Sequence, residues 1–237
     1  MNKIKIAGVV IRETAIKEFD SLILILTAEG LISGIAYGAR KPAGSKTSGT
    51  RLFCYSEFLI FEKDGNCTID SAVPIDTFFG ISKSAQALAA ASYMAEVLGD
   101  AALAGVQDNE LMRLALVSFY ALSQGKRDIA TVKAAFELRI TAVCGYEPML
   151  DNDGDTFSYI DGCVFNRGEE DEDETTQITQ GTLMAMRHII NADMKKLMSF
   201  EVTGQTREIL IQICEKYLQI QFDKKYKTLS IYKSIAM

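Results

Sequence analysis

The pattern of apolar residues in the first third of the chain predicts a set of short β-strands. Apolar runs rich in β-branched residues, and runs in which apolar and polar residues alternate, are typical of strands. The pairs Glu29-Gly30 and Asp64-Gly65 separate neighbouring runs and indicate tight turns. The predicted strands are Ile4–Arg12, Leu22–Thr27, Leu31–Tyr37, Leu52–Glu62 and Cys67–Val73.

The connection between the third and fourth predicted strands covers Gly38–Arg51 and is the longest of the set. Its glycine, proline, serine and threonine residues favour turns over regular structure. A sheet of five short antiparallel strands has to protect its edges, and closure into a barrel does so. We therefore predict an oligonucleotide-binding (OB) barrel over residues 1–78, with a small SH3-like barrel as the alternative that strand number leaves open.

Beyond residue 79 the apolar residues recur at three- and four-residue spacing, which is typical of amphipathic helices. The fold class is therefore α+β, with the barrel followed by an all-helical domain over residues 79–237. The first three helices should form an antiparallel bundle, either as a second domain or as a second layer packed on the barrel. The predicted helices are Lys83–Ala104, Asn109–Gln124, Ile129–Val143 and two segments that begin at Thr179 and Thr206.

A small insert interrupts the helical region at about residues 149–178. Gly145 and Pro148 end the preceding helix, because glycine terminates helices and proline cannot continue one. A hairpin is predicted over Thr156–Phe165, turning at Asp161-Gly162. The six acidic residues at 169–174 indicate an exposed loop.

Charge is unevenly distributed along the chain. The net charge is −6, yet ten of the 31 acidic residues lie between Asp151 and Glu174, and the remainder of the chain is slightly basic. No acidic residue occurs between Glu29 and Glu57. The long connection of the barrel lies in this acid-free window, so it can follow a phosphate backbone.

The candidate DNA-binding residues follow from this charge pattern. Basic side chains can contact phosphates, aromatic side chains near them can stack on bases, and the basic C-terminal tail from Asp223 offers a second surface. Phe53 is a further candidate for stacking beside the two tyrosines. The predicted set is Arg40, Lys41, Lys46, Arg51, Tyr37, Tyr55, Lys224 and Lys225.

Other classes of site have little support in the sequence. No phosphate-binding loop or dinucleotide fingerprint occurs, and His188 is the only histidine, so no catalytic residues are predicted. The five cysteines show no paired spacing and are interpreted as reduced thiols. No apolar stretch reaches the roughly 18 residues of a membrane span, and a cytoplasmic, nucleoid-associated protein is expected.

Several local strings resemble the RecO family of bacterial DNA repair and recombination-mediator proteins. They are GVVIRET near the N-terminus, the run from Phe19 to Pro42 that ends in GARKP, and the run from Phe136 to Asp151 that contains GYEP. The order of barrel, helices and hairpin insert agrees with this resemblance over essentially the whole chain.

The resemblance implies a non-enzymatic mediator. Such a protein binds single- and double-stranded DNA, anneals complementary strands and helps to load recombinase onto strands coated with single-strand-binding protein. Its expected partners are that protein and a RecR-type mediator. Many relatives carry a structural zinc site of four cysteines in the insert, whereas this insert contains only Cys163, so no metal or cofactor is expected.

Two other functions are compatible with the sequence. An OB-like barrel can serve a protein–protein adaptor, because small barrels host unrelated functions. An RNA-binding factor would instead prefer structured RNA to DNA. Salt-dependent DNA affinity separates both from the DNA-binding mediator.

Overall fold

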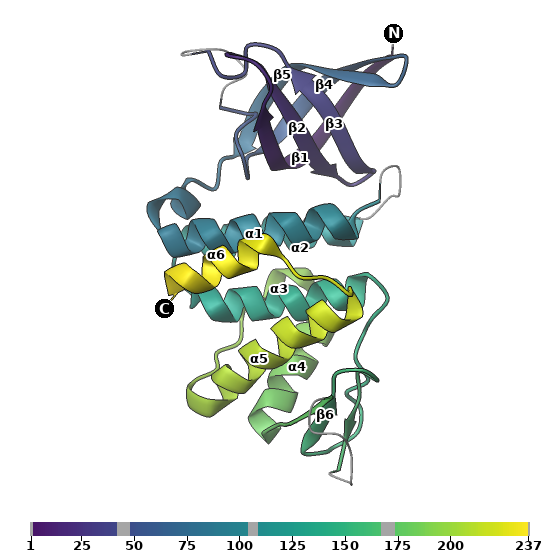
Figure 1. Cartoon of the computed structure of the whole chain (residues 1–237), viewed down its shortest axis with the longest axis vertical. Helices are drawn as coiled ribbons and strands as arrows, with labels where there is room; N and C mark the ends of the chain where they lie inside the picture. Colours follow the sequence, from purple (N-terminus) through teal and green to yellow (C-terminus); the bar gives the residue numbers. More distant parts are fainter. Residues whose placement is uncertain (1, 42–47, 104–108, 167–173, 237) are drawn as a thin grey trace. The chain divides into compact units, whose positions relative to one another are not determined.

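The computed structural model describes residues 2–41, 48–103, 109–166 and 174–236. It divides into two compact units (Figure 1), of which the first comprises Met1–Gln124 and Tyr226–Met237 and the second Gly125–Lys225. The second unit is therefore an insertion in the chain of the first. The boundary between a barrel domain and a helical domain at residue 78 stays a prediction. The compact units divide the chain elsewhere, because two further helices and the C-terminal segment belong to the same unit as the barrel.

Five strands of the first unit close into a barrel in the order β1-β2-β3-β5-β4. Antiparallel pairs join β1 to β2 and β4, β2 to β3, and β4 to β5, while β3 and β5 run parallel. The OB-like architecture predicted from the sequence is confirmed. The strands are β1 (Asn2–Ala15), β2 (Ser21–Thr27), β3 (Gly30–Ala36), β4 (Tyr55–Lys63) and β5 (Asn66–Asp76).

Alternation along the strands fills the barrel with apolar side chains. In β4, Ser56, Phe58 and Ile60 are buried, while the residues between them are half-buried, as the period of two predicts. Buried residues from all five strands and from the connection after β3 form the core. They are Val10, Ile23, Ile25, Ala36, Ala39, Phe58, Ile60, Ile69 and Ala72.

One predicted strand boundary is wrong. β4 begins at Tyr55, not at Leu52, because Phe53 takes a left-handed backbone conformation with φ of 68°. Its N–H donates to the carbonyl of Val10 at 2.8 Å, and the N–H of Val10 donates to the carbonyl of Cys54 at 3.0 Å. The pairing of β1 with β2 shifts register just beyond this point, between Val10 and Arg12.

The helices of the first unit pack near one end of the barrel. Both α1 (Ala85–Ala101) and α2 (Asn109–Gln124) contact β1, and α2 also contacts the 3-10 helix η1 (Phe79–Lys83). The C-terminal helix α6 (Lys227–Ala236) lies along α1 (Figure 1). The carboxylate of Glu96 in α1 accepts hydrogen bonds from the N–H and hydroxyl of Thr228, which caps α6.

The second unit combines three helices with a small sheet. Helix α3 (Ile129–Val143) packs against α4 (Gln180–Asn191) and α5 (Gly204–Gln221), with the 3-10 helix η2 (Met194–Lys196) between the last two. The predicted hairpin is confirmed. Its strands β6 (Thr156–Ser158) and β7 (Val164–Phe165) are joined by β8 (Thr175–Gln177), which the sequence analysis missed.

A buried ion cluster joins α3 to α5. The ammonium of Lys133 lies 2.8 Å from the carboxylate of Glu137 and 2.9 Å from that of Glu215. The side chains of Lys133 and Glu137 are fully buried. Burial alone lowers the pKa of Lys133, but the two carboxylates outweigh it and the pKa is raised. The lysine is therefore charged at neutral pH.

None of the helices in the described part of the chain combines the length and apolar character needed to cross a membrane.

Replacing Lys133 by methionine should lower the free energy of unfolding by about 3–5 kcal/mol, because a buried carboxylate then loses its cation. The triple change Lys133→Met, Glu137→Leu, Glu215→Leu should recover most of this loss, since no charge remains in the cluster. Urea unfolding followed by circular dichroism measures both effects. A loss below about 1 kcal/mol in the single variant would show that the cluster does not stabilise the unit.

Candidate nucleic-acid interface

The connection between β3 and β4 is attached to the rest of the barrel at its first end. The N–H of Gly38 donates to the carboxylate of Asp20 at 2.9 Å, and the N–H of Arg40 donates to the carbonyl of Phe19 at 3.1 Å. Gly38 has φ of 70°, a conformation that glycine adopts without strain. The connection thus begins against the turn that joins β1 to β2.

An exposed hollow of about 440 Å³ lies at this junction; we call it the small hollow. Tyr37 is 51% exposed, and the ammonium of Lys41 lies 5.9 Å from the ring centroid of Phe19. Basic and aromatic side chains in one hollow can bind a phosphate and a base face together. The small hollow is lined by Lys17, Glu18, Phe19, Asp20, Tyr37, Gly38 and Lys41.

The second end of the connection is packed closely onto β5. The hydroxyl of Ser56 donates to the carbonyl of Gly49 at 2.8 Å. A Cβ atom at Gly49 would lie 2.4 Å from the carbonyl oxygen of Ala72, so only glycine fits here. This contact holds the segment that leads to Arg51 against the barrel.

A second, larger hollow of about 670 Å³ opens at this end; we call it the large hollow. It brings together Arg40 and Arg51, both exposed, from the two ends of the connection. Phe79 at the start of η1 is 68% exposed. The large hollow is lined by Glu13, Ala39, Arg40, Ser48, Arg51, Leu52, Phe53, Cys54, Thr77, Phe78, Phe79, Ile81, Ser82 and Leu88.

The electrostatics of the large hollow suit an anion. The lining contains two arginines and one carboxylate, that of Glu13, which accepts a hydrogen bond from Ser21 at 3.0 Å. Burial raises the pKa of the Cys54 thiol, an effect that its hydrogen bond to Ser56 opposes and the charge of Asp76 reinforces. The thiol is therefore neutral and adds no charge against a phosphate.

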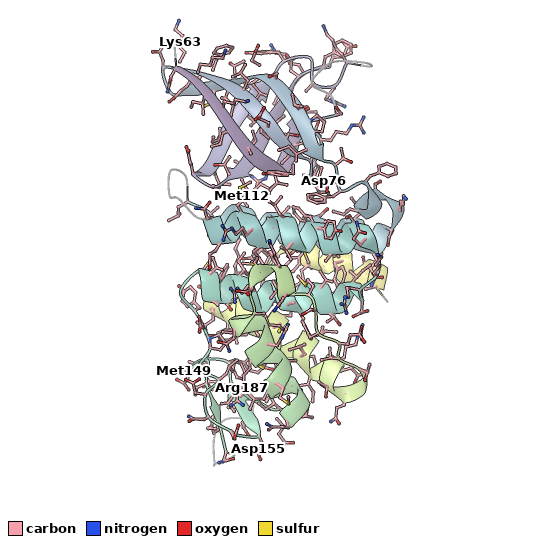
Figure 2. The ribbon with its side chains drawn as sticks, turned by 180° about the vertical axis from the view of Figure 1, so that it is seen from behind. Lys63, Asp76, Met112, Met149, Asp155 and Arg187 are labelled. Atoms are coloured by element: carbon pink, nitrogen blue, oxygen red, sulfur yellow. The ribbon has the colours of Figure 1, made fainter. Side chains whose placement is uncertain are left out.

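The predicted residues differ in exposure and in position. Four of them are exposed: Tyr37 and Lys41 line the small hollow, and Arg40 and Arg51 line the large hollow. Tyr55 is half-buried and pairs with Val9 and Asp76 as part of β4; Asp76 is labelled in Figure 2.

Four predicted residues remain. Lys46 lies outside the described residues. Lys224 and Lys225 are exposed at the end of the second unit. The predicted basic tail is mostly helical, because α6 begins at Lys227. Phe53, the further candidate for stacking, is buried.

Sequence reasoning missed Lys17, Phe19 and Phe79. The first two lie in the short turn between β1 and β2, which joins the long connection only once the barrel closes. That turn is a common binding loop of OB barrels, and this rule could have pointed to it. Phe79 follows the last strand in a region without a clear periodic pattern, and no sequence signal distinguished it from a core residue.

The insert does not fit zinc. A closed zinc site needs four cysteine or histidine ligands, and Cys163 is the one cysteine between residues 149 and 178. Instead Arg187, labelled in Figure 2, holds the turn that follows α3. Its guanidinium donates to the carbonyls of Leu150 at 2.7 Å, Asp151 at 3.2 Å and Asn152 at 3.1 Å. It also donates to the carboxylate of Asp153 at 3.1 Å. In the described residues no three potential metal ligands converge.

Comparison with known families accounts for nearly the whole chain. Residues 1–78 match the family described as Recombination protein O N terminal, and residues 83–230 match Recombination protein O C terminal. The first matched region is the OB-like barrel, a class of fold that binds oligonucleotides or oligosaccharides in other proteins. The chain belongs to the RecO family of recombination proteins.

Curated relatives carry the same family name. The protein called DNA repair protein RecO in Acetivibrio thermocellus is 30% identical, with 99% of this chain and 98% of the relative covered. Proteins of the same name from Alkaliphilus metalliredigens and Clostridium kluyveri are 24% and 26% identical and are each matched over 98% of this chain, covering 99% and 93% of the relatives. The similarity therefore extends across both units.

Replacing Gly49 by alanine should lower the free energy of unfolding by about 1–3 kcal/mol, because the new methyl group overlaps the backbone of β5. Thermal and urea unfolding measure the change. Gly99→Ala in α1 is the control, since its Cβ would meet Ile11 at an ordinary 3.6 Å and alanine favours helix. Equal stability of the Gly49 variant and the wild type would contradict the close contact at Ala72.

Proposed function

We propose that this protein is a non-enzymatic, DNA-binding mediator of recombinational repair. In this role it binds single- and double-stranded DNA, anneals complementary strands and helps to load a recombinase onto strands coated with single-strand-binding protein. The partners are that protein and a RecR-type mediator, with the recombinase engaged indirectly. A protein with these partners acts on the chromosome, in the cytoplasm.

The observation that carries the proposal is the basic, acid-free connection of a RecO-family barrel. Arg40, Lys41 and Arg51 are exposed on it, and between Glu29 and Glu57 the sequence holds no carboxylate that would repel phosphates. Phosphate contacts of this kind give affinity without sequence preference. That property suits a protein that acts wherever DNA is damaged.

Annealing also requires that the repulsion between two DNA strands be reduced. Two complementary strands repel each other, and a protein that neutralises phosphates lowers this repulsion. Lys224 and Lys225 offer a second basic surface for the other strand, and they stay part of the proposal. Stacking on Tyr37, with Tyr55 as a further candidate, would hold a base without reading its identity.

Changing Arg40, Lys41, Lys46 and Arg51 together to alanine should weaken DNA binding and flatten its salt dependence. For single strands, the slope of log affinity against log salt should become shallower by about 0.7 for every phosphate that the variant no longer neutralises. Fluorescence anisotropy with a labelled single-stranded oligonucleotide at several salt concentrations measures both effects. A matched control replaces Lys3, Lys126, Lys195 and Lys196, which are exposed elsewhere, and removes the same charge.

The outcomes of this experiment separate the possible surfaces. Equal losses in the two quadruple variants would show that only net charge matters and would contradict a dedicated loop. Salt-sensitive binding that survives the loop variant would move the DNA surface to Lys224 and Lys225. Absence of binding at low salt would favour the protein–protein adaptor, and a strong preference for structured RNA would favour the RNA-binding factor.

A further inference from the structure

We propose that the large hollow holds one unstacked base of a single DNA strand, with Phe79 as its stacking surface. Arg40 and Arg51 contact the phosphates on either side of that base. The inference rests on the proposed function and extends it, because it assigns a preference for single strands to one residue. Phosphate contacts alone do not supply such a preference.

The composition of the hollow fits a nucleotide. A volume of about 670 Å³ is within the usual range of small-molecule sites. Leu52, Leu88 and Phe79 supply exposed apolar surface, on which a base can stack. The ammonium of Lys83 lies 5.5 Å from the ring centroid of Phe79 and adds positive charge beside that ring.

Two further phenylalanines of the hollow have left-handed backbones, with φ of 68° at Phe53 and 42° at Phe78. Such conformations are strained for bulky residues and cluster at functional sites. Both are held in place. Their rings pack against Phe119 with centroids 5.2 and 6.3 Å away, and the N–H of Phe78 donates to the carboxylate of Asp76 at 2.8 Å.

The left-handed conformations of Phe53 and Phe78 fix where the neighbouring elements begin. The left-handed turn at Phe53 ends the connection just before β4, and the one at Phe78 starts η1. Both rings are buried, so packed core side chains form the floor of the hollow. Phe79, which follows Phe78 in the chain, remains outside the core. An exposed aromatic ring beside a rigid apolar floor is a preorganised stacking platform.

The geometry favours a single strand over a duplex. In a duplex the bases are stacked and paired, so none can lie against Phe79 unless it is first extruded, and extrusion costs free energy. A single strand offers unstacked bases without that cost. Duplex DNA can still contact the arginines through its phosphates.

The first test compares single-stranded and duplex affinity in Phe79→Ala. We expect a loss of about 5- to 150-fold for a single-stranded oligonucleotide, the range of one stacked base, and little change for a duplex of the same length. Tyr120→Ala is the matched control, because Tyr120 is an exposed aromatic residue of the same unit outside the hollow. Circular dichroism checks that both variants fold.

A second test uses the absence of tryptophan from the chain. Phe79→Trp introduces a single tryptophan, whose fluorescence should be quenched by a saturating single-stranded oligonucleotide and much less by a duplex. Tyr120→Trp should respond to neither. Near wild-type affinity in Phe79→Trp would show that an aromatic face at this position is sufficient.

The contradicting outcomes are distinct from failure of the proposed function. An unchanged ratio of single-stranded to duplex affinity in Phe79→Ala, with binding still weakened in the quadruple loop variant, would overturn the base site and leave the DNA-binding loop standing. Unquenched tryptophan fluorescence of Phe79→Trp at saturation would do the same. Quenching by a polyglutamate peptide but not by DNA would assign the hollow to an acidic protein partner and overturn the inference.

Discussion

The parallel pairing of β3 with β5 decides where this protein presents its basic surface. Gly34 lies opposite Cys67 and Ile35 opposite Thr68, so β5 occupies the place beside β3 and β4 is paired with β1 and β5 instead. A tight turn cannot join two strands that are not neighbours. The chain therefore needs the long connection over residues 37–54, and this connection carries the arginines and lysines to which we assign DNA contact.

The attachments of the connection turn a long loop into a defined surface. At its start, hydrogen bonds to Asp20 and Phe19 hold it beside the small hollow. At its end, the close approach of Gly49 to Ala72 and the hydrogen bond from Phe53 to Val10 hold it against the barrel, and Phe53 lines the large hollow. Aromatic and basic side chains line both hollows, although no residue lines both of them. Phenylalanines with left-handed backbones, Phe53 and Phe78, line only the large one. General phosphate affinity and single-strand preference can thus reside in adjacent parts of one barrel.

Much of the fold followed from hydrophobic periodicity, because burial of one face imposes it. The alternation in β4 and the helical spacing of α1 to α5 are examples. Packing between residues far apart in the chain could not be predicted from the sequence. Phe53 reads as a strand residue until the hydrogen bonds to Val10 are known, and the lysines around α6 indicate a basic tail, although Leu229 and Tyr232 are buried. At the site, the charge pattern indicated Arg40, Lys41 and Arg51. The positions of Phe19 and Phe79 depend instead on the closure of the barrel and on η1, and no local sequence pattern indicates either of these.

Photo-crosslinking of the wild-type protein to a single-stranded oligonucleotide that carries a photoreactive base tests the central claim most directly. Mass spectrometry of the crosslinked peptides then locates the contact without any substitution. We predict crosslinks within residues 37–55, at the turn containing Phe19 and at Phe79, all of which diminish as salt is raised. Crosslinks confined to residues 125–225, with the barrel unmarked, would contradict the assignment of DNA binding to the barrel.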